Sequence, residues 1–493
     1  MSSKSIAFVI AVVVFVIFRS FELGSLPVFL DEGIRGSVAL DDEKSAFEKF
    51  VACSQVGKPT IGLLLSLFSR LPVPTLVGFR LMSVFFGTLT VLVLFHLGVG
   101  LATVYGIRRP LGMGLWMSGL YALSPMAHFF DRLAVPDSAT YCGSAVLALV
   151  SLKFGRVKPG VRGVVWISAA MGALLLVRLC NFLYFPLPFL LLLSFPDGPW
   201  RGKHLWALFG TMLVLCLAVF LGLDQIGAFP ESELDSKLSF RWDKLDDAGK
   251  WLWATYGTLH SAPVAALLLF SPWVALAAAP RRAFPWCVLA LICILVQALA
   301  MKHWMIRYHF GWALPYFVCA GTVLHVLWVK LWNGSSSAWI LRGAALMAVL
   351  LIAVDGVGRC LRISTRPENA ELPGVMRHQY VYSWPSGFAL ESAMDFLQER
   401  QQKRGRPFHV FMVRPDPGVL GMTLYAEDDD GMSVSEYHPD VHRACVAAGK
   451  DVYLVQSSKY GKPAGQLPWK KVRVFPFRDE RYEIRLLEAV LLD

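Results

Sequence analysis

Long apolar segments alternate with short polar ones along most of the chain. A helix needs about 20 mainly apolar residues to cross a bilayer, and eleven runs approach or exceed that length. They cover residues 5–22, 76–105, 111–130, 138–153, 163–179, 180–196, 205–223, 259–279, 285–301, 309–330 and 338–355. The pattern predicts a polytopic α-helical membrane protein with about 11 transmembrane helices.

Composition supports this interpretation. The 493 residues are 55% hydrophobic and 17% charged, with a mean hydropathy of +0.51, which excludes an ordinary water-soluble globule. The net charge of +11 is interpreted as a signal for membrane orientation and not for nucleic-acid binding. Most of the nine cysteines lie in apolar runs without a CxxC pair, so they predict buried apolar groups and no disulfide or zinc framework.

The charges between the runs predict an orientation. Only Lys4 precedes the first run, and no small-residue cleavage site follows it, so we expect a retained signal anchor with a cytoplasmic N-terminus. Basic residues then fall on the cytoplasmic side and most loop carboxylates on the other. The cytoplasmic cations include Arg108, Arg109, Lys153, Arg156, Lys158, Arg162, Arg201, Lys203, Arg281, Arg282, Lys330 and Arg342.

Residues 163–196 are ambiguous because Arg178 and Asn181 interrupt the apolar sequence. Two short spans are predicted, since basic loops flank the region at both ends, and one long tilted helix is the alternative. Eleven spans place two outer loops, 23–75 and 224–258, and the polar C-terminal tail in the same compartment.

The tail has ordinary charge density and alternating elements. Residues 388–402 and 417–426 predict helices, and 408–413, 451–456 and 471–477 predict strands. We therefore expect a transmembrane domain over residues 1–358 and a small extracytoplasmic α/β domain over 359–493.

Three outer segments carry candidate chemistry. The first loop opens with Asp31 and Glu32, and a carboxylate at a membrane surface can act as a general base on an acceptor hydroxyl. A solvated loop acid or a helix cap is the alternative explanation. The short turn with Asp131, Arg132 and Asp137 either serves a site or contains a local ion pair and a cap for the next helix.

The third segment contains Lys302, His303, Arg307 and Tyr308 at the expected headgroup level. Such residues often form an interfacial belt with cations that extend toward the lipid surface. They are also suited to clamp a lipid phosphate, with Arg307 forming paired hydrogen bonds and Lys302 acting as a point charge. Lys58, at the end of the first loop, would join them.

Together these segments favour sugar transfer from a polyprenyl phosphate. The leaving phosphate needs positive charge aimed at it, and the attacking hydroxyl needs a carboxylate. The hypothesis requires Asp31 and Arg307 to converge on one pocket, although they are far apart in the sequence.

The arrangement of these motifs resembles the C-type glycosyltransferase (GT-C) superfamily. The shared features are the acidic pair, Lys58-Pro59, the Arg132-to-Asp137 turn and Arg307-Tyr308. Over residues 1–355 the chain is similar to the family 39 protein mannosyltransferase and aminoarabinose lipid A transferase group. The segment 383–388 (SWPSGF) resembles the Trp-Pro-Ser-Gly-Tyr motif that opens the outer tail of bacterial members.

The resemblance implies an inverting glycosyltransferase of the bacterial cell envelope, in the inner (plasma) membrane, with its active site and C-terminal domain periplasmic or extracellular. It would transfer a hexose or pentose from a polyprenyl-phosphate donor to a lipid, glycan or protein. No cofactor is certain, and assistance by a divalent metal stays open. The implied catalytic residues are Asp31, Glu32 and Asp137, the phosphate-binding residues are Lys58, Arg132, Lys302, Arg307 and Tyr308, and Asp131 and His303 support them.

Thr60 departs from the family pattern, which usually has a second proline there, and the repeated sugar-binding modules of eukaryotic mannosyltransferases are absent from the sequence. A multi-span transporter or flippase of a glycolipid or anionic solute is the main alternative, because charged groups in membrane spans also mark ion-coupled pathways. The outer-boundary position of the acids and the lack of a two-fold repeat favour the enzyme. A ligase that transfers a whole glycan from a polyprenyl diphosphate and a non-catalytic scaffold are further alternatives.

Overall fold

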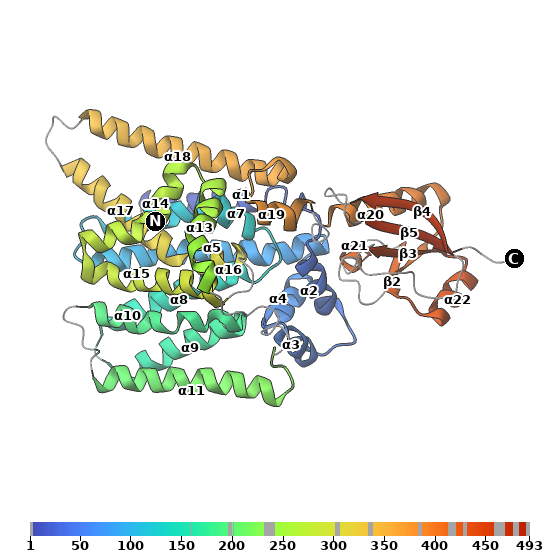
Figure 1. The fold of residues 1–493 in the computed structure, drawn as a ribbon, viewed down its shortest axis with the longest axis horizontal. Coiled ribbons are helices and arrows are strands. Elements are labelled where there is room, and N and C mark those ends of the chain that lie inside the picture. Colours follow the sequence, from blue (N-terminus) through green and yellow to red (C-terminus); the bar gives the residue numbers. More distant parts are fainter. Residues whose placement is uncertain are drawn as a thin grey trace.

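The computed structural model describes most of the chain. It covers residues 3–157, 159–195, 200, 202–230, 242–300, 306–333, 339–382, 387–412, 421–426, 431–457, 469–476 and 483–489. This part of the chain forms a large helical bundle, and a five-stranded sheet follows near the C-terminal end (Figure 1).

The N-terminal half of the bundle surrounds the long helix α5, which packs against α6 and α8. Its elements are α1 (Ser3–Ser20), α2 (Leu30–Leu40), α3 (Ala46–Ser54), α4 (Ile61–Phe68), α5 (Thr75–Val104), α6 (Pro110–Ala122), α7 (Pro125–Phe130), α8 (Asp137–Gly155), α9 (Val161–Val177), the 3-10 helix η1 (Leu179–Tyr184), α10 (Pro186–Ser194) and α11 (Lys203–Gln225).

The second half packs α14 against α15 and α17. Its elements are η2 (Trp242–Lys244), α13 (Leu245–Leu259), α14 (Ala262–Ala278), α15 (Pro280–Leu295), the π-helix η3 (Val296–Ala300), α16 (Ile306–Gly311), α17 (Leu314–Asn333), α18 (Trp339–Thr365), η5 (Pro367–Asn369), α19 (Gly374–Arg377) and the π-helix η6 (His378–Tyr382).

Each predicted apolar run coincides with a helix or with consecutive helices. Within the described residues, four helices are long and apolar enough to cross a membrane: Thr75–Val104, Lys203–Gln225, Pro280–Leu299 and Leu314–Asn333. Shorter apolar helices occur at Ile10–Ser20, Val161–Val177, Leu179–Leu193 and Ala262–Ala278. The total of eleven crossings stays a prediction.

The chain reverses direction at Arg178. This residue has an extended backbone, with φ −159° and ψ 123°, between α9 and η1. After α10, the Trp200 indole N–H donates to the Phe154 carbonyl at 2.9 Å, and its ring lies against Gly163 near the start of α9. Residues 163–195 therefore form two antiparallel helical segments, as predicted, and the alternative of one long helix is wrong.

Both predicted outer loops contain helices. The first, 23–75, folds into α2, α3 and α4, whose buried residues Ala39, Cys53 and Leu65 form a core with Phe79 of α5. The second, 224–258, contains η2 and most of α13, and its residues 231–241 lie outside the described part. The polar stretches are thus short structured elements around one end of the bundle.

The C-terminal domain contains α20 (Phe388–Arg404), α21 (Met422–Ala426) and α22 (Pro439–Ala447) around a sheet of order β2-β1-β3-β5-β4. Strands β2, β1 and β3 are parallel, and β5 is antiparallel to both β3 and β4. Helix α20 packs on one face and α22 on the other. The strands are β1 (Phe408–Met412), β2 (Met432–Glu436), β3 (Asp451–Ser457), β4 (Trp469–Pro476) and β5 (Glu483–Ala489).

The predicted small α/β domain is therefore observed, with α20, β1, β3 and β4 at the expected places. Of the predicted helix 417–426, residues 422–426 form α21, and 413–420 lie outside the described part. Strands β2 and β5 and helix α22 were not predicted from the sequence. These elements are short, and β2 carries three serines or glutamates among its five residues, so it lacks a strong apolar signal.

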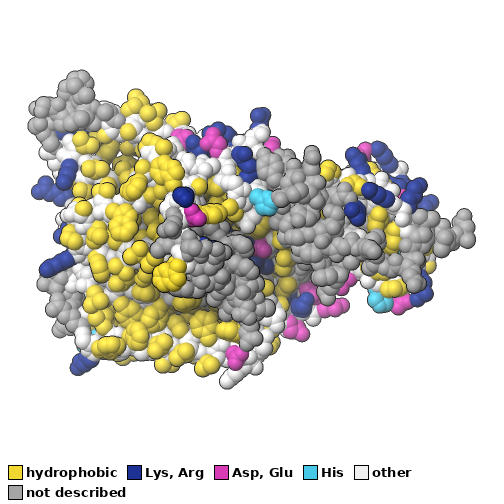
Figure 2. Space-filling model, in the orientation of Figure 1, with side chains coloured by type: hydrophobic (Ala, Val, Ile, Leu, Met, Phe, Trp, Pro, Cys, Tyr) yellow, Lys and Arg dark blue, Asp and Glu magenta, His cyan; other side chains and the backbone are white. Residues whose placement is uncertain are grey.

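The surface of the bundle is largely apolar, as shown in yellow in Figure 2. Large exposed apolar side chains include Val14, Trp206, Val214, Leu351 and Val354. An apolar surface this extensive requires lipid or another apolar partner. Figure 2 also shows Lys and Arg side chains along the end of the bundle away from the C-terminal domain, which fits the predicted grouping of cations on one side.

Candidate active site

Asp31 lies in the first turn of α2, the helix that opens the first outer segment. Its Oδ2 atom lies 3.3 Å from Nη2 of Arg35 and 3.9 Å from Nζ of Lys58. The same atom forms an ion pair with Nη1 of Arg307. The Asp31 side chain is 15% exposed, so it is held by cations without being sealed from a substrate. The structure thus brings Asp31 and Arg307 into direct contact.

Arg307 and Tyr308 belong to the short helix α16, and both are buried. The guanidinium carbons of Arg307 and Arg178 lie 5.3 Å and 4.3 Å from the centre of the Tyr308 ring. Cations over an aromatic face are attracted by the ring quadrupole. Tyr308 therefore holds two arginines beside each other, although like charges repel.

Asp137 reaches the cluster through Arg178. Its Oδ1 atom accepts a hydrogen bond from Nη1 of Arg178 at 2.7 Å, and both side chains are buried. The second carboxylate oxygen of Asp137 has no hydrogen-bond partner in the described part of the chain. Asp137 thus orients Arg178 against Tyr308. This role is indirect, whereas the sequence predicted that Asp137 contacts the substrate.

Three members of the cluster were missed by the sequence analysis as site residues: Arg35, Arg178 and Tyr380. Burial lowers the pKa of the Arg35 guanidinium to about 10, so it stays charged at neutral pH. Tyr380, in η6, packs on Phe29 at 4.4 Å between ring centres and lies within electrostatic range of Arg307. The cluster has four cationic and two carboxylate side chains, a formal excess of two positive charges.

Lys58 is positioned by backbone contacts with the Arg178 reversal. The Leu179 N–H donates to the Gly57 carbonyl at 3.0 Å, and the Thr60 N–H donates to the Leu176 carbonyl at 3.2 Å. The Thr60 hydroxyl donates to the same carbonyl at 3.1 Å. A proline at position 60 has neither donor, so the departure from the family pattern has a structural function here.

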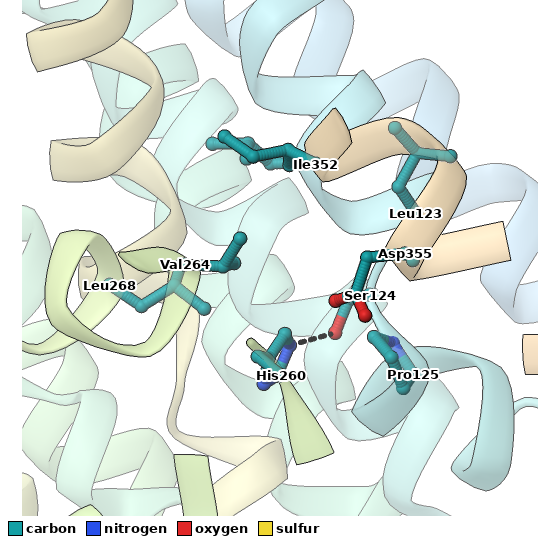
Figure 3. A pocket seen from close by; sticks show the side chains of 10 residues that line it. Leu123, Ser124, Pro125, His260, Val264, Leu268, Ile352 and Asp355 are labelled. Atoms are coloured by element: carbon teal, nitrogen blue, oxygen red, sulfur yellow. Dashed lines mark hydrogen bonds between the residues drawn. The ribbon is translucent and has the colours of Figure 1, made fainter. Parts of the chain in front are cut away.

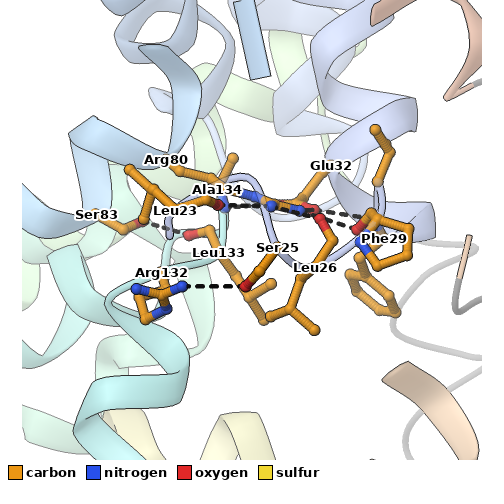
Figure 4. A network of polar contacts seen from close by, with 12 residues as sticks. Leu23, Ser25, Leu26, Phe29, Glu32, Arg80, Ser83, Arg132, Leu133 and Ala134 are labelled. Carbon is orange, nitrogen blue, oxygen red and sulfur yellow. Dashed lines mark hydrogen bonds and ion pairs between the residues drawn. The ribbon is translucent and has the colours of Figure 1, made fainter. Parts of the chain in front are cut away.

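Glu32 has a different environment from its neighbour Asp31. Its Oε1 atom accepts from Nε of Arg80 at 3.0 Å and from the Ala134 N–H at 2.6 Å. Its Oε2 atom accepts from Nη2 of Arg80 at 2.8 Å and from the Phe29 N–H at 2.9 Å. Figure 4 shows this network. Glu32 is fully buried, and each of its carboxylate oxygens accepts two hydrogen bonds. These bonds position the start of α2, and this geometry does not support the predicted contact of Glu32 with acceptor or sugar.

Arg132 is also engaged within the scaffold. Its guanidinium donates to the carbonyls of Arg19, Phe21 and Glu22, where α1 ends. It also donates to the Ser25 hydroxyl at 3.3 Å, as seen in Figure 4. The last carbonyls of a helix have no intrahelical partner, so Arg132 stabilises the end of α1. This geometry does not support the predicted contact with a lipid phosphate.

Asp131 is fully buried next to Arg132. It pairs with Nε of Arg19 at 3.3 Å and accepts hydrogen bonds from Tyr121 at 2.9 Å and Ser138 at 2.7 Å. These contacts join α1, α6 and α8, so Asp131 supports the bundle and not the reacting groups. The predicted residues Lys302 and His303 lie outside the described part of the chain.

Arg178 shares one sequence signal with Arg19 and Arg80, the two arginines that pair with Asp131 and Glu32. Arg19, Arg80 and Arg178 all lie within or at the edge of predicted apolar runs, where an ionisable side chain is unfavourable without a partner. Each has a carboxylate partner in the structure. A search for acids to match these cations would have found the scaffold roles of Asp131 and Glu32.

A second polar site is too small for a sugar. Figure 3 shows a cavity where the Ser124 hydroxyl lies 3.1 Å from Nε2 of His260, with Asp355 nearby. Its volume is about 30 Å³, close to that of one water molecule. Ligand pockets commonly measure roughly 300–1,000 Å³. This cavity therefore does not compete with the Asp31 cluster as a substrate site.

Metal assistance was left open by the sequence. Within the described residues, no group of three or more His, Cys, Asp or Glu side chains is arranged to hold a metal ion. The positive charge beside Asp31 comes from Arg35, Lys58 and Arg307. Three cationic side chains thus surround one carboxylate.

The fold is similar to two crystal structures of ArnT from Cupriavidus metallidurans. The structure bound to undecaprenyl phosphate matches with a TM-score of 0.56 and 17% identity, over 99% of this chain and 98% of that chain. The apo structure matches with a TM-score of 0.54 and 16% identity, over 98% of each chain. No protein-family model and no curated protein sequence matches the chain. The likeness shows that the chain has a GT-C fold.

Proposed function

We propose that the protein is an inverting glycosyltransferase that moves a sugar from a polyprenyl-phosphate donor to an acceptor. The observation that carries this proposal is the ion pair between Asp31 and Arg307 inside a cluster with an excess of positive charge. A base and a phosphate-binding surface are thereby adjacent, as the reaction requires. The GT-C fold, shared with a protein bound to undecaprenyl phosphate, gives further support.

In this mechanism Asp31 is the general base. Its carboxylate accepts the proton of the acceptor hydroxyl while the hydroxyl oxygen attacks the anomeric carbon of the sugar. The bond between that carbon and the phosphate oxygen breaks, and the polyprenyl phosphate leaves with the bonding electrons. Attack opposite the leaving group inverts the anomeric configuration.

Arg307, Arg35 and Lys58 stabilise the charge that develops on the departing phosphate. These are the cations that Asp31 contacts, so a donor phosphate competes with the carboxylate for them. Donor binding would thereby weaken the hold on Asp31 and leave its oxygen available to an acceptor. Tyr308 and the Asp137–Arg178 pair keep the cluster in place, with Lys302 and His303 as further predicted contributors.

We further propose that the active site and the C-terminal domain face the extracytoplasmic side of a cell-envelope membrane, with the N-terminus in the cytoplasm. The positive-inside rule supports this orientation, because Arg281, Arg282 and Lys330 occupy the bundle end opposite Asp31. The proposal includes a lipid, glycan or protein acceptor and either a hexose or a pentose as the transferred sugar.

The decisive experiment compares wild type with Asp31→Asn. Purified protein is incubated with radiolabelled polyprenyl-phosphate hexoses and pentoses and a lipid and glycan extract. We expect label to enter an acceptor with inverted anomeric configuration and the variant to be slower by a factor of about 10²–10⁴. Asp41→Asn is the matched control, because Asp41 follows the other end of α2 and pairs with Lys44.

Equal transfer by wild type and Asp31→Asn would remove Asp31 from the mechanism. Movement of labelled donor across a sealed vesicle membrane, without label in any acceptor, would instead support the transporter alternative. Retained anomeric configuration in the product would contradict direct displacement by the acceptor.

A further inference from the structure

A ligand-sized cavity lies at the opposite end of the bundle from Asp31. It has a volume of about 330 Å³ and lies between the ends of α5, α14 and α17 and the start of α15. Its apolar wall includes Leu101, Ala278 and Trp286, and Arg282 and Lys330 also line it. The cavity thus combines an apolar interior with two cationic side chains.

This cavity is separate from the candidate active site. Helix α5 contacts Glu32, the neighbour of Asp31, through Arg80 near its start and reaches the cavity through Leu101 near its end. Helix α17 follows α16, which carries Arg307, and its last turns bring Lys330 to the cavity. Because a helix rises 1.5 Å per residue, Lys330 lies about 24 Å along α17 from Leu314 at its start.

A neighbouring cavity lies on the other side of the start of α15. It measures about 500 Å³ and is lined by Leu193, Leu276, Phe284 and Arg281. Between the two cavities, the Tyr105 hydroxyl lies 3.3 Å from the Ser194 hydroxyl and donates to the Arg282 carbonyl at 3.4 Å. Two mainly apolar spaces therefore flank a pair of adjacent arginines.

The charges at this place are available to an anion. Arg281, Arg282 and Lys330 are exposed, and in the described part of the chain none of them forms an ion pair with a carboxylate. The Arg282 guanidinium lies 5.6 Å from the centre of the Tyr105 ring. The guanidinium N–H groups point outward in the plane of that group, so this contact does not use them as donors. Arginine donates to phosphate in pairs, and lysine adds a point charge.

We propose that an anionic diacyl phospholipid binds here. Its phosphate contacts Arg281, Arg282 and Lys330, and its two acyl chains occupy the two cavities. A diacyl lipid fits because two apolar spaces lie on opposite sides of one cationic pair. The bound lipid would join the ends of α14, α15 and α17 and stabilise the bundle far from the reacting groups. This site is independent of the proposed sugar transfer and its donor lipid.

The test measures lipid binding and thermal stability of delipidated protein in detergent. Phosphatidylglycerol and phosphatidylcholine with the same acyl chains are titrated, and bound lipid is counted by native mass spectrometry. We expect phosphatidylglycerol to bind more tightly and to raise the melting temperature. Arg281→Gln/Arg282→Gln should weaken its binding by about 10- to 30-fold, because each cation contributes about 1 kcal/mol to attraction for an anionic lipid.

Two further variants separate the contribution of the acyl-chain contacts from a general effect of positive charge at this end of the bundle. Ala278→Phe fills the cavity that contains Arg282 from an exposed position, so it should weaken binding while all charges are kept. Arg162→Gln/Lys203→Gln removes two cations from helix starts at the same end of the bundle that line neither cavity, and binding should be unchanged. Equal binding of the two lipids, or equal binding by all variants, would overturn the proposal. Neither readout depends on transfer activity.

Discussion

Two turns of this protein present an arginine at the same end of the bundle, and the structure uses them differently. Arg132, between α7 and α8, donates to backbone carbonyls at the end of α1. Arg307, at the start of α16, pairs with the partly exposed carboxylate of Asp31. The backbone carbonyls that hold Arg132 are fixed by the end of α1, whereas the Asp31 side chain can turn away from Arg307 so that a phosphate takes its place. In the proposed mechanism, only the second arginine therefore binds an anionic substrate.

The adjacent acids Asp31 and Glu32 repeat this contrast. Glu32 is fully buried and its four acceptor positions are filled by Arg80 and two backbone N–H groups. Asp31 faces cations that can also bind phosphate. The residue type alone does not separate a scaffold group from a reacting group, but the identity of its partners does.

The largest effect is expected at Arg307. Arg307→Gln removes a cation from the leaving phosphate, and loss of one such preorganised donor lowers turnover by about 10²- to 10³-fold. Thermal stability should change little, since Asp31 keeps Arg35 and Lys58 as partners. Steady-state transfer kinetics with a labelled donor provide the measurement. Arg307→Lys should recover part of the rate, and unchanged kinetics in Arg307→Gln would contradict the assignment.

Arg132→Gln should have the opposite profile. Without the guanidinium, the carbonyls of Phe21 and Glu22 lose a charged donor, and we expect a loss of about 3 kcal/mol in the free energy of unfolding. The folded fraction should transfer sugar within a few-fold of wild type. Thermal unfolding in detergent and activity per folded protein measure the two effects. If Arg132→Gln lowers donor affinity and leaves stability unchanged, the Arg132 turn binds donor as the Arg307 turn does, and the contrast between them is wrong.

A third prediction concerns the contact between the C-terminal domain and the acidic helix. Gly387, which precedes α20 with φ +76°, is so close to Val28 that an added Cβ would lie 2.2 Å from the Val28 carbonyl oxygen. Val28 precedes Asp31 by three residues, and its backbone N–H donates a hydrogen bond to the Tyr425 hydroxyl at 3.4 Å. Leu424 of the same domain lies against Gly36 of α2. Gly387→Ala should therefore displace α2 and slow transfer by about 10-fold.

Gly405→Ala is its matched control. Gly405 follows the same helix with φ +63°, and no atom lies within 4 Å of an added Cβ. Both alanines pay about 1–2 kcal/mol for the left-handed backbone, but only Gly387→Ala should slow transfer by folded protein. Equal rates for the two variants would show that the C-terminal domain does not position Asp31.

The smallest effect is expected at Thr60. Thr60→Val removes the hydroxyl bond to the Leu176 carbonyl and keeps the backbone bond, which should reduce stability by about 1 kcal/mol. Because this turn carries Lys58, the KM for donor should rise a few-fold, and Thr60→Ser should restore it. A KM unchanged in Thr60→Val would mean that the remaining backbone bonds position Lys58 sufficiently.

Much of the fold was predictable because its signals are local. Apolar runs predicted the helices, and alternating patterns predicted α20, β1, β3 and β4. The reversal at Arg178 was also visible, as a charged residue between two apolar segments. The site was predicted in part: Asp31, Lys58, Arg307 and Tyr308 come together, while Arg35 and Tyr380 entered only through packing.

The amino-acid sequence by itself determined that most of this chain forms apolar helices, that most loop acids collect at one end of them and a group of cations at the other, and which side chains carry charge. Hydrophobicity and helical period depend on residues close together in the chain, so no tertiary information is needed for them. Only the tertiary structure decided that Glu32 and Arg132 stabilise the scaffold while Asp31 and Arg307 face each other. Hydrogen bonds act over about 3 Å, and partners from distant segments reach that distance only when the helices pack.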